Sequence, residues 1–450
     1  MLEVNGKRLL IDCGMYQGKR AEMYSRNRNF RFDPRNVDAV VLTHAHIDHS
    51  GNLPNLVKNG YEGSIYGTLA SCDLADLMLR DSAHIQESDA EYVNKKRARK
   101  GEPPVEPIYT TEDAEKVVKQ LIKKDYDEYF SPMPGVVLRL RDAGHILGSA
   151  AIEVEVDEGG NKRRLWFSGD IGRRNLHLLR DPILPEGEID YLVMESTYGD
   201  KQHRDPLEAY EELLQVVKET IKKRGKVVVP AFAVGRTQEL VYALNLFVSD
   251  KRMPAIPVYV DSPLAVNASD IFRRHPECYD RETRDFIKEH NHPALEFERL
   301  TYIRSVEASK ALNRMPGPMI ILSASGMAET GRILHHLKNN IEDSRNMILI
   351  VSWQAPYTLG RRLADRATRV RIFGEEYVRR AGVTTIGGLS GHAGQNLLVE
   401  YARSAAKGKQ LKRIFLVHGE PEKARVLQSR LSEAGLPQTY YPEMSESVEL

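Results

Sequence analysis

One apolar segment of the chain ends in a dense group of ionisable side chains. His44, His46, Asp48 and His49 follow the stretch 37–42 in the run VVLTHAHIDHSG. Because that stretch is apolar and β-branched, we expect a buried strand, with the polar group in the loop after it, where sites are commonly built. Three histidines and a carboxylate placed there without a ligand would lose hydration, so the pattern favours a metal site over a solvated turn.

The same loop has enough ligands to contribute to two metal sites. Imidazole nitrogens and carboxylate oxygens are the ligands that Zn²⁺ prefers in catalytic sites. Alternation along the loop can turn His44 and His46 toward one ion while Asp48 and His49 reach a second. We therefore expect parts of two sites in this one loop.

Composition sets wider limits on the chain. Its 450 residues are enough for two domains, or for one domain interrupted by another. No apolar stretch approaches the ~20 residues of a membrane span and the start does not resemble a signal peptide, which predicts a cytoplasmic protein without membrane contact. Cys13, Cys72 and Cys278 are scattered, which argues against disulfides and thiolate zinc sites. With a net charge of +1, nucleic-acid binding would need a locally basic groove.

The first part of the chain is predicted to be rich in strands. Asn5-Gly6 suits a two-residue turn, so residues 1–12 should form a hairpin. Helices are expected from Leu69 to about Tyr92 and at 111–124, with a basic loop at 95–100 between them. Further strands are expected at 136–141, 151–156 and 164–167.

From Tyr191 onward, strands alternate with helices. Asp205 suits an N-cap, Pro206 the first helical position, and Glu208 completes a capping-box spacing. Further strands are predicted at 226–230, 256–260, 318–322 and 347–352, which implies a mostly parallel sheet flanked by helices. The last third returns to histidine-bearing strand ends, so we expect an α/β domain inserted into an outer one.

Three later residues complete a ligand set. His145, Asp170 and His418 each lie beside glycine at a predicted strand end. Each alone would be read as a core histidine or a turn aspartate. Together with the first cluster they suffice for two ions: His44, His46 and His145 on one, Asp48, His49 and His418 on the other, and Asp170 bridging. Ions so bridged lie ~3.5–4 Å apart and share a hydroxide whose pKa falls toward ~7.

The ordered motifs resemble a known family. Leu10 to Gly14, the HAHIDH loop, His145 and Asp170 are similar to the motifs of the metallo-β-lactamase superfamily. Glu195 in MESTYGD, His392 in LSGHAG and His418 in VHGE resemble those of its β-CASP nucleases, which include the RNA 3′-processing endonuclease and RNase J. The resemblance implies an αββα sandwich over 1–199 and 376–450. An α/β β-CASP cap built on a mostly parallel sheet would occupy 200–375, with nucleic acid in the cleft between them.

The resemblance also implies roles for single residues. Two Zn²⁺ ions would be bound, with Asp48 and Asp170 taking part in catalysis and Asp12 orienting a ligand. Glu195 would hold His392, whose imidazolium protonates the leaving oxygen. In the cap, loops after two strands would contact the substrate through Arg236, Ser323, Ser325 and Gly326, although ordinary glycine turns are an equal alternative. For the basic loop at 95–100 a solvated surface is favoured over RNA contact.

The resulting hypothesis is a zinc-dependent ribonuclease that cuts single-stranded RNA endonucleolytically, with a 5′-to-3′ exonuclease mode left open. The alternatives are a DNA-directed β-CASP nuclease, where an apolar residue is typical in place of His418, and a small-molecule metallo-hydrolase, which would not need the cap. Members of the family usually carry a further strand before the hairpin, and here Met1 falls directly before it. We therefore expect the first sheet to lack that edge strand, either truly or because the start of the chain was assigned late, which would leave an exposed edge. Such an edge favours pairing with another chain, and a homodimer is left open.

Overall fold

The chain is divided into two compact units. The computed structural model describes residues 1–16 and 20–450. The first unit comprises 1–172, 182–202 and 392–450, and the second comprises 173–181 and 203–391. Each unit has its own sheets and its own core, so the two are described separately.

The first sheet of the first unit begins with the predicted hairpin. Its order is β1-β2-β3-β4-β5, with bounds Leu2–Val4, Lys7–Ile11, Ala39–Val41, Ser64–Thr68 and Leu121–Lys124. β1 and β2 pair antiparallel through Asn5 and Gly6, which both have positive φ (50° and 73°), as a tight hairpin turn requires. The other strands run parallel, so the residues after β2 and β3 meet at one edge.

The second sheet brings three more predicted site segments to one edge. Its order is β20-β19-β10-β9-β8-β7-β6, with bounds Thr439–Tyr440, Arg413–Val417, Tyr191–Glu195, Asn161–Phe167, Ala150–Glu158, Val136–Asp142 and Phe130–Met133. β9, β10 and β19 run parallel. Asp170, Glu195 and His418 lie at or just after the ends of these strands and are thereby brought together.

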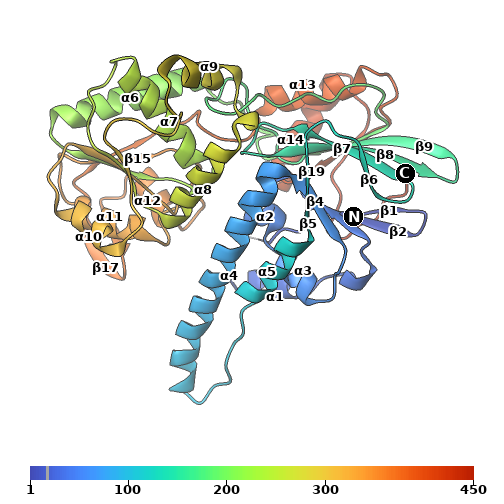
Figure 1. The fold of residues 1–450 in the computed structure, drawn as a ribbon, viewed down its shortest axis with the longest axis horizontal. Coiled ribbons are helices and arrows are strands. Elements are labelled where there is room, and N and C mark those ends of the chain that lie inside the picture. The colour runs from blue at the N-terminus through green and yellow to red at the C-terminus, as the bar shows by residue number, and fades with distance from the viewer. Residues whose placement is uncertain (17–19) are drawn as a thin grey trace. The chain divides into compact units, whose positions relative to one another are not determined.

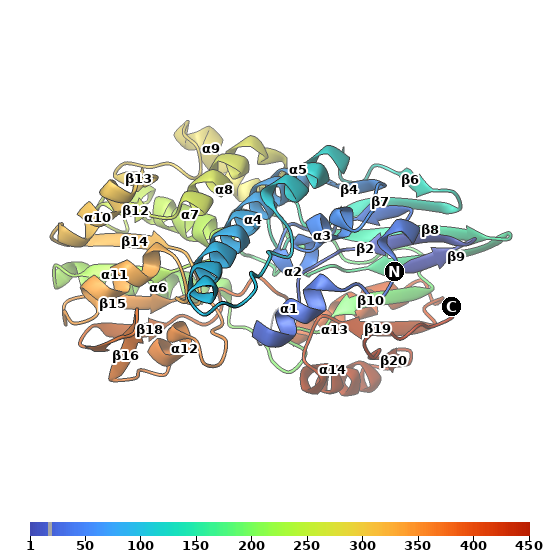
Figure 2. The same cartoon turned by 90° about the horizontal axis from the view of Figure 1, so that it is seen from below.

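The two sheets and their helices form the expected α/β/β/α sandwich (Figures 1 and 2). Leu9 and Val41 from one sheet meet Leu138 from the other in the central core. On the outside of the first sheet lie α3 (Leu53–Lys58), α4 (Leu69–Ala98) and α5 (Thr111–Gln120), joined through residues such as Leu79. The outside of the second sheet is covered by α13 (Gln395–Ala406) and α14 (Pro421–Glu433), which pack around Trp166.

The second unit is built on the predicted parallel sheet. Its order is β13-β12-β14-β11-β15-β18, with bounds Leu300–Tyr302, Val258–Val260, Met319–Ser323, Lys226–Pro230, Met347–Ile350 and Gly382–Thr385. Helices α6 (Pro206–Lys222), α7 (Arg236–Ser249), α8 (Pro263–Arg274), α9 (Arg281–His290), α10 (Val306–Arg314), α11 (Arg332–Asn340) and α12 (Leu359–Ala364) connect and flank these strands. A small antiparallel pair, β16 (Arg369–Ile372) and β17 (Glu375–Val378), follows α12. Asp205 caps α6 as predicted, accepting a hydrogen bond from the backbone N–H of Leu207.

Two helix predictions were wrong at their ends. α4 does not stop near Tyr92 but continues to Ala98, so four of the six residues of the predicted basic loop, 95–98, are helical. Lysine and arginine are good helix formers and no glycine lies between Gly67 and Gly101, which explains the extension. The helix predicted to reach Lys124 ends at Gln120, and Leu121–Lys124 form β5 because they pair with β4.

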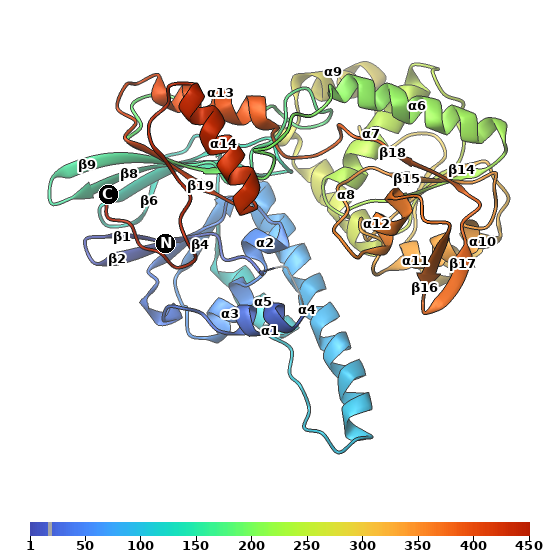
Figure 3. The same ribbon diagram turned by 180° about the vertical axis from the view of Figure 1, so that it is seen from behind.

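Two further helices belong to the first unit. α1 (Arg20–Arg28) and the short α2 (Ile47–Ser50) precede α3. Figure 3 shows α4 extending well beyond α3 and α5. In the part of the chain that the structure describes, none of the helices is long and apolar enough to cross a membrane. A homodimer stays a prediction.

Candidate metal centre

The histidine-rich loop starts where β3 ends and is held against the segment after β2. His44 and His46 lie before α2, while Asp48 and His49 are on it, so a turn of helix rather than a loop presents the second pair. The backbone N–H of Cys13 donates to the carbonyl of His49 at 2.8 Å. A Cβ on Gly14 would lie 1.5 Å from the carbonyl oxygen of Asp48, so only glycine permits this approach.

One group of ligands gathers around His46. Its Nδ1 lies 3.2 Å from Nε2 of His44 and 3.2 Å from Nε2 of His145. Both of those Nε2 atoms lie 3.5 Å from Oδ2 of Asp170. One ligand atom from each of these four residues is within 4.8 Å of the others, a spacing at which a single ion can be held.

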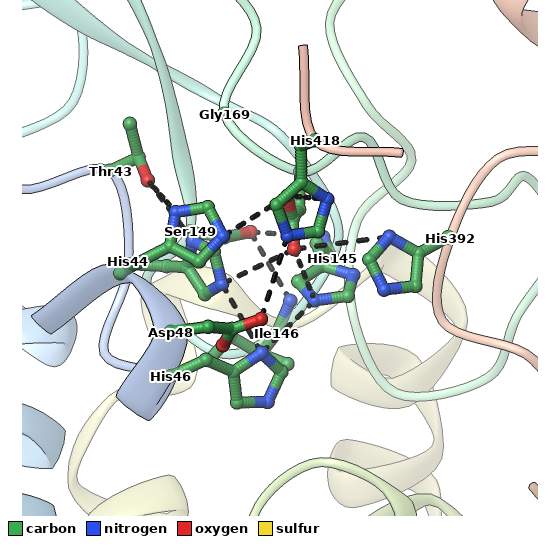
Figure 4. A network of polar contacts seen from close by, with 12 residues as sticks. Thr43, His44, His46, Asp48, His145, Ile146, Ser149, Gly169, His392 and His418 are labelled. Carbon is green, nitrogen blue, oxygen red and sulfur yellow. Dashed lines mark hydrogen bonds and ion pairs between the residues drawn. The ribbon is translucent and has the colours of Figure 1, made fainter. Parts of the chain in front are cut away.

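A second group of candidate ligands lies beside the other carboxylate oxygen of Asp170. Oδ1 of Asp170 lies 3.3 Å from Nε2 of His49 and 3.3 Å from Nδ1 of His418. Nε2 of His418 is 3.5 Å from Oδ2 of Asp48. Asp48, His49 and His418 again have ligand atoms within 4.8 Å of one another. Asp170 thus lies between the two groups, and Figure 4 shows the side chains pointing toward a common centre.

The donor set fits a cation. Nε2 of His49 and Oδ1 of Asp170 are buried without a hydrogen-bond partner, which is costly unless a ligand satisfies them. Burial lowers the pKa of His44 and His46, which favours the neutral imidazole that coordinates metal. Burial also opposes charge on His418, but Asp170 and Asp48 raise its pKa to about 9. A potential that stabilises imidazolium there also favours a metal cation.

Asp12 and Thr43 contact the imidazoles of two candidate ligands, His49 and His44. Oδ2 of Asp12 accepts from Nδ1 of His49 at 2.7 Å and from the hydroxyl of Thr43 at 2.7 Å. The Thr43 hydroxyl also lies 3.0 Å from Nδ1 of His44. Asp12 adopts a positive φ of 59°, an uncommon conformation for a residue other than glycine that directs its carboxylate into this contact.

Glu195 and His392 form a pair beside the candidate metal ligands. The fully buried carboxylate of Glu195 lies 3.2 Å from Nδ1 of His392, and its other oxygen accepts from the backbone N–H of Ile171 at 2.6 Å. Burial lowers the pKa of His392, but Glu195 and Asp170 outweigh it and raise that pKa. The side chain of His392 is 22% exposed, so its imidazole is open to solvent on one side.

Sequence reasoning missed two supporting hydroxyls. Thr43 stands immediately before His44, and Thr197 lies 3.1 Å from Nδ1 of His418. The signal for both was position alone, since Thr43 directly precedes the HAHIDH loop and Thr197 lies within the MESTYGD segment.

The predicted cap residues lie in the second unit, whereas all members of the two candidate ligand groups lie in the first. Arg236 is buried in an ion pair with Glu239, and the hydroxyl of buried Ser323 donates to the carbonyl of Asp261 at 2.7 Å. The hydroxyl of Ser325 accepts from the backbone N–H of Glu329 at 3.2 Å, and Gly326 lies against the ring of Phe232. Arg236 and Ser323 therefore hold their own loops, and contact of any of these residues with RNA stays a prediction.

Comparisons with known proteins agree with a metal-dependent hydrolase. Residues 1–231 match the metallo-β-lactamase superfamily, 237–363 the β-CASP domain, and 376–442 the Zn-dependent metallo-hydrolase RNA specificity domain. Ribonuclease TTHA0252 of Thermus thermophilus is 38% identical over 97% of this chain and 93% of its own length. The transcription termination factor FttA is 31% identical in Methanothermobacter thermautotrophicus, over 100% of this chain and 69% of its own length. In Methanocaldococcus jannaschii it is 32% identical over 97% of this chain and 67% of its own length. The chain therefore belongs to the metallo-β-lactamase superfamily, in its β-CASP branch, and is a metallo-hydrolase of that family.

Proposed function

We propose that the protein is a zinc-dependent ribonuclease that hydrolyses single-stranded RNA with two ions per chain. The observation that carries the proposal is the carboxylate of Asp170, which lies within 3.5 Å of histidine nitrogens in both groups and has a buried oxygen, Oδ1, without a hydrogen-bond partner. His44, His46 and His145 would hold one ion, and Asp48, His49 and His418 the other. Two ions bound in this way neutralise charge on phosphate oxygens and lower the pKa of a nucleophilic water.

His392 would act as the general acid. Its Nδ1 faces the Glu195 carboxylate, so a proton stays on that atom and the second imidazolium proton is carried on Nε2. That proton is the one available to a departing ribose oxygen. Glu195 cannot move far, because its other oxygen is held by the backbone N–H of Ile171.

RNA is favoured over DNA for two reasons. His418 is a metal-site histidine where DNA-directed relatives typically have an apolar residue, as inferred from the family resemblance. In addition, His392 and His418 both fall within the segment that matches an RNA specificity domain, and the relative from Thermus thermophilus is named a ribonuclease. Endonucleolytic cutting is the proposed mode, with 5′-to-3′ exonuclease activity as a second mode.

The test is a paired cleavage assay. Purified protein of measured metal content is given 5′-labelled RNA and DNA of identical sequence at matched salt, since phosphate contacts depend steeply on ionic strength. We expect two zinc ions per chain, internal cuts in RNA and slower or no cutting of DNA. Asp170→Ala should lose metal and activity together, while Asp285→Ala, a surface aspartate of the second unit, should retain both. Equal rates on DNA and RNA would overturn the assignment to the RNA branch, and full activity with one ion or none would overturn the two-ion mechanism.

A further inference from the structure

The far end of α4 is an exposed, strongly basic projection that the metal centre does not use. Figures 1 and 3 show the helix reaching beyond the elements packed beside it. Its tip carries a run of cations that is followed by a single carboxylate, Glu102, before Pro103. The cations are Lys95, Lys96, Arg97, Arg99 and Lys100, of which all but Arg97 are exposed.

The returning chain fixes the tip in one conformation. The side chain of Asn94 accepts from the backbone N–H of Val105 at 2.7 Å and donates to its carbonyl at 2.9 Å. Arg97 donates to the carbonyl of Pro103 at 2.6 Å and lies 3.2 Å from Glu102. Arg97 is thus used to hold the tip, and little further ordering of the backbone is needed before a ligand binds.

Three cations of the tip are available to a ligand. Within residues 1–16 and 20–450, no ion pair involves Lys95, Arg99 or Lys100. Unpaired, exposed cations on a fixed backbone form a local positive field, which the overall charge of +1 conceals.

An exposed aromatic ring lies among these cations. Tyr92 is 60% exposed, and the ammonium of Lys96 lies 4.2 Å from the centre of its ring. Tyr92 and Lys96 also line a hollow of about 320 Å³, together with Asp89, Val93, Arg97, Lys100 and Glu102. A ring of this kind amid cations can stack a base while phosphates contact the charges, the combination that single-strand binding surfaces use.

We propose that the tip of α4 is a second binding site for single-stranded RNA, separate from the metal centre. Lys95, Arg99 and Lys100 contact phosphates, and Tyr92 stacks a base. The proposal rests on the proposed ribonuclease function, because it assumes that RNA is the substrate.

The length of α4 decides which RNAs can use both sites. Near its start, the hydroxyls of Thr68 and Ser71 donate to the carbonyl of Gly148, in the loop that carries His145. A helix rises ~1.5 Å per residue, so the tip lies about 40 Å along the helix from this anchor. At ~3.4 Å per stacked nucleotide this distance corresponds to roughly 12 nucleotides. Shorter RNAs would occupy the metal centre alone.

The experiment compares a charge-neutralised tip with a matched control. The tip variant is Lys95→Gln, Arg99→Gln and Lys100→Gln, which keeps good helix formers. The control is Lys119→Gln, Arg403→Gln and Arg425→Gln, which removes the same charge from exposed helical positions of the same unit. Each protein is tested with RNAs of about 6 and about 30 nucleotides, below and above the calculated span.

The tip variant should bind the longer RNA at least tenfold more weakly, with a salt slope reduced by about 2 for three lost phosphate contacts. Its kcat/KM on the shorter RNA should equal that of the wild type, and Tyr92→Ala should weaken only long-RNA binding. Unchanged binding of the longer RNA, or equal loss on both lengths or in the control, would overturn the proposal. A wild type that cuts neither RNA would instead refute the proposed function.

Discussion

At the scale of single residues, the environment of His392 separates a general acid from a metal ligand. Its Nδ1 lies 3.2 Å from the carboxylate of Glu195 and farther, 3.8 Å, from that of Asp170. Together with Asp170 and His418, His392 could also form a third ligand group. The nearer carboxylate favours the acid. His392→Ala should therefore keep both ions and RNA binding yet turn over ~10²–10⁴-fold more slowly, with Glu195→Gln a milder form. Metal content and single-turnover rate are measured on one preparation; loss of zinc would make His392 a ligand, and an unchanged rate would leave it structural.

Asp12 offers a second test at this scale. Because Asn tolerates the positive φ that Asp12 adopts, Asp12→Asn should preserve the backbone while weakening the carboxylate contact to His49. Zinc affinity should fall about 10- to 100-fold, as measured by competition with a chelator. Asp38→Asn is the control. Asp12 accepts the backbone N–H of Thr43, and Asp38 likewise accepts a backbone N–H, that of Arg8 in β2, but does not touch the centre. Equal zinc affinities in the two variants would show that Asp12 does not support the metal site.

At the scale of elements, the segment after β2 packs against α2 so closely that only glycine fits at position 14. Gly14→Ala would place a methyl group against the carbonyl of Asp48, so α2 must shift. We expect a loss of about 1–3 kcal/mol in the free energy of unfolding together with weaker metal binding. Gly387→Ala, where a Cβ meets nothing within 4 Å, should change neither. Urea unfolding and zinc titration of both variants test this, and a stable Gly14→Ala protein with full zinc affinity would contradict it.

The local sequence pattern predicted the elements with strong periodicity or turn residues. It did not predict the strand that depends on pairing with a distant segment. The Asn5-Gly6 hairpin and β7 to β9 were predictable because their signals lie within a few residues. β5 was predicted as helix because its strand character arises only from pairing with β4, which lies more than fifty residues earlier in the chain. For the site, residue types and motif order suggested the ligands, whereas the hydroxyls of Thr43 and Thr197 became visible only with the side chains in place.

At the scale of the whole molecule, all the proposed metal ligands belong to one of the two units. His44 to His49, His145, Asp170 and His418 lie in the first unit, whose cores are distinct from the core around Val228 and Ile348 in the second. Metal that binds only the folded form stabilises by about 4 kcal/mol when its free concentration is ~1,000 times Kd. Removing the metal should therefore destabilise the first unit more than the second.

Amide hydrogen exchange, measured with and without a chelator, can show this difference between the two units. Removing zinc should speed amide exchange in β3 and β10, which lead into the centre, because local opening no longer has to release a bound ion. Exchange in β11 and β14 should stay unchanged, since neither strand carries a proposed ligand. Asp170→Ala is the internal control: its first unit should exchange like the chelated wild type whether or not the chelator is present. Equal acceleration of β11 and β3 would mean that the ions stabilise the whole chain rather than the unit that binds them.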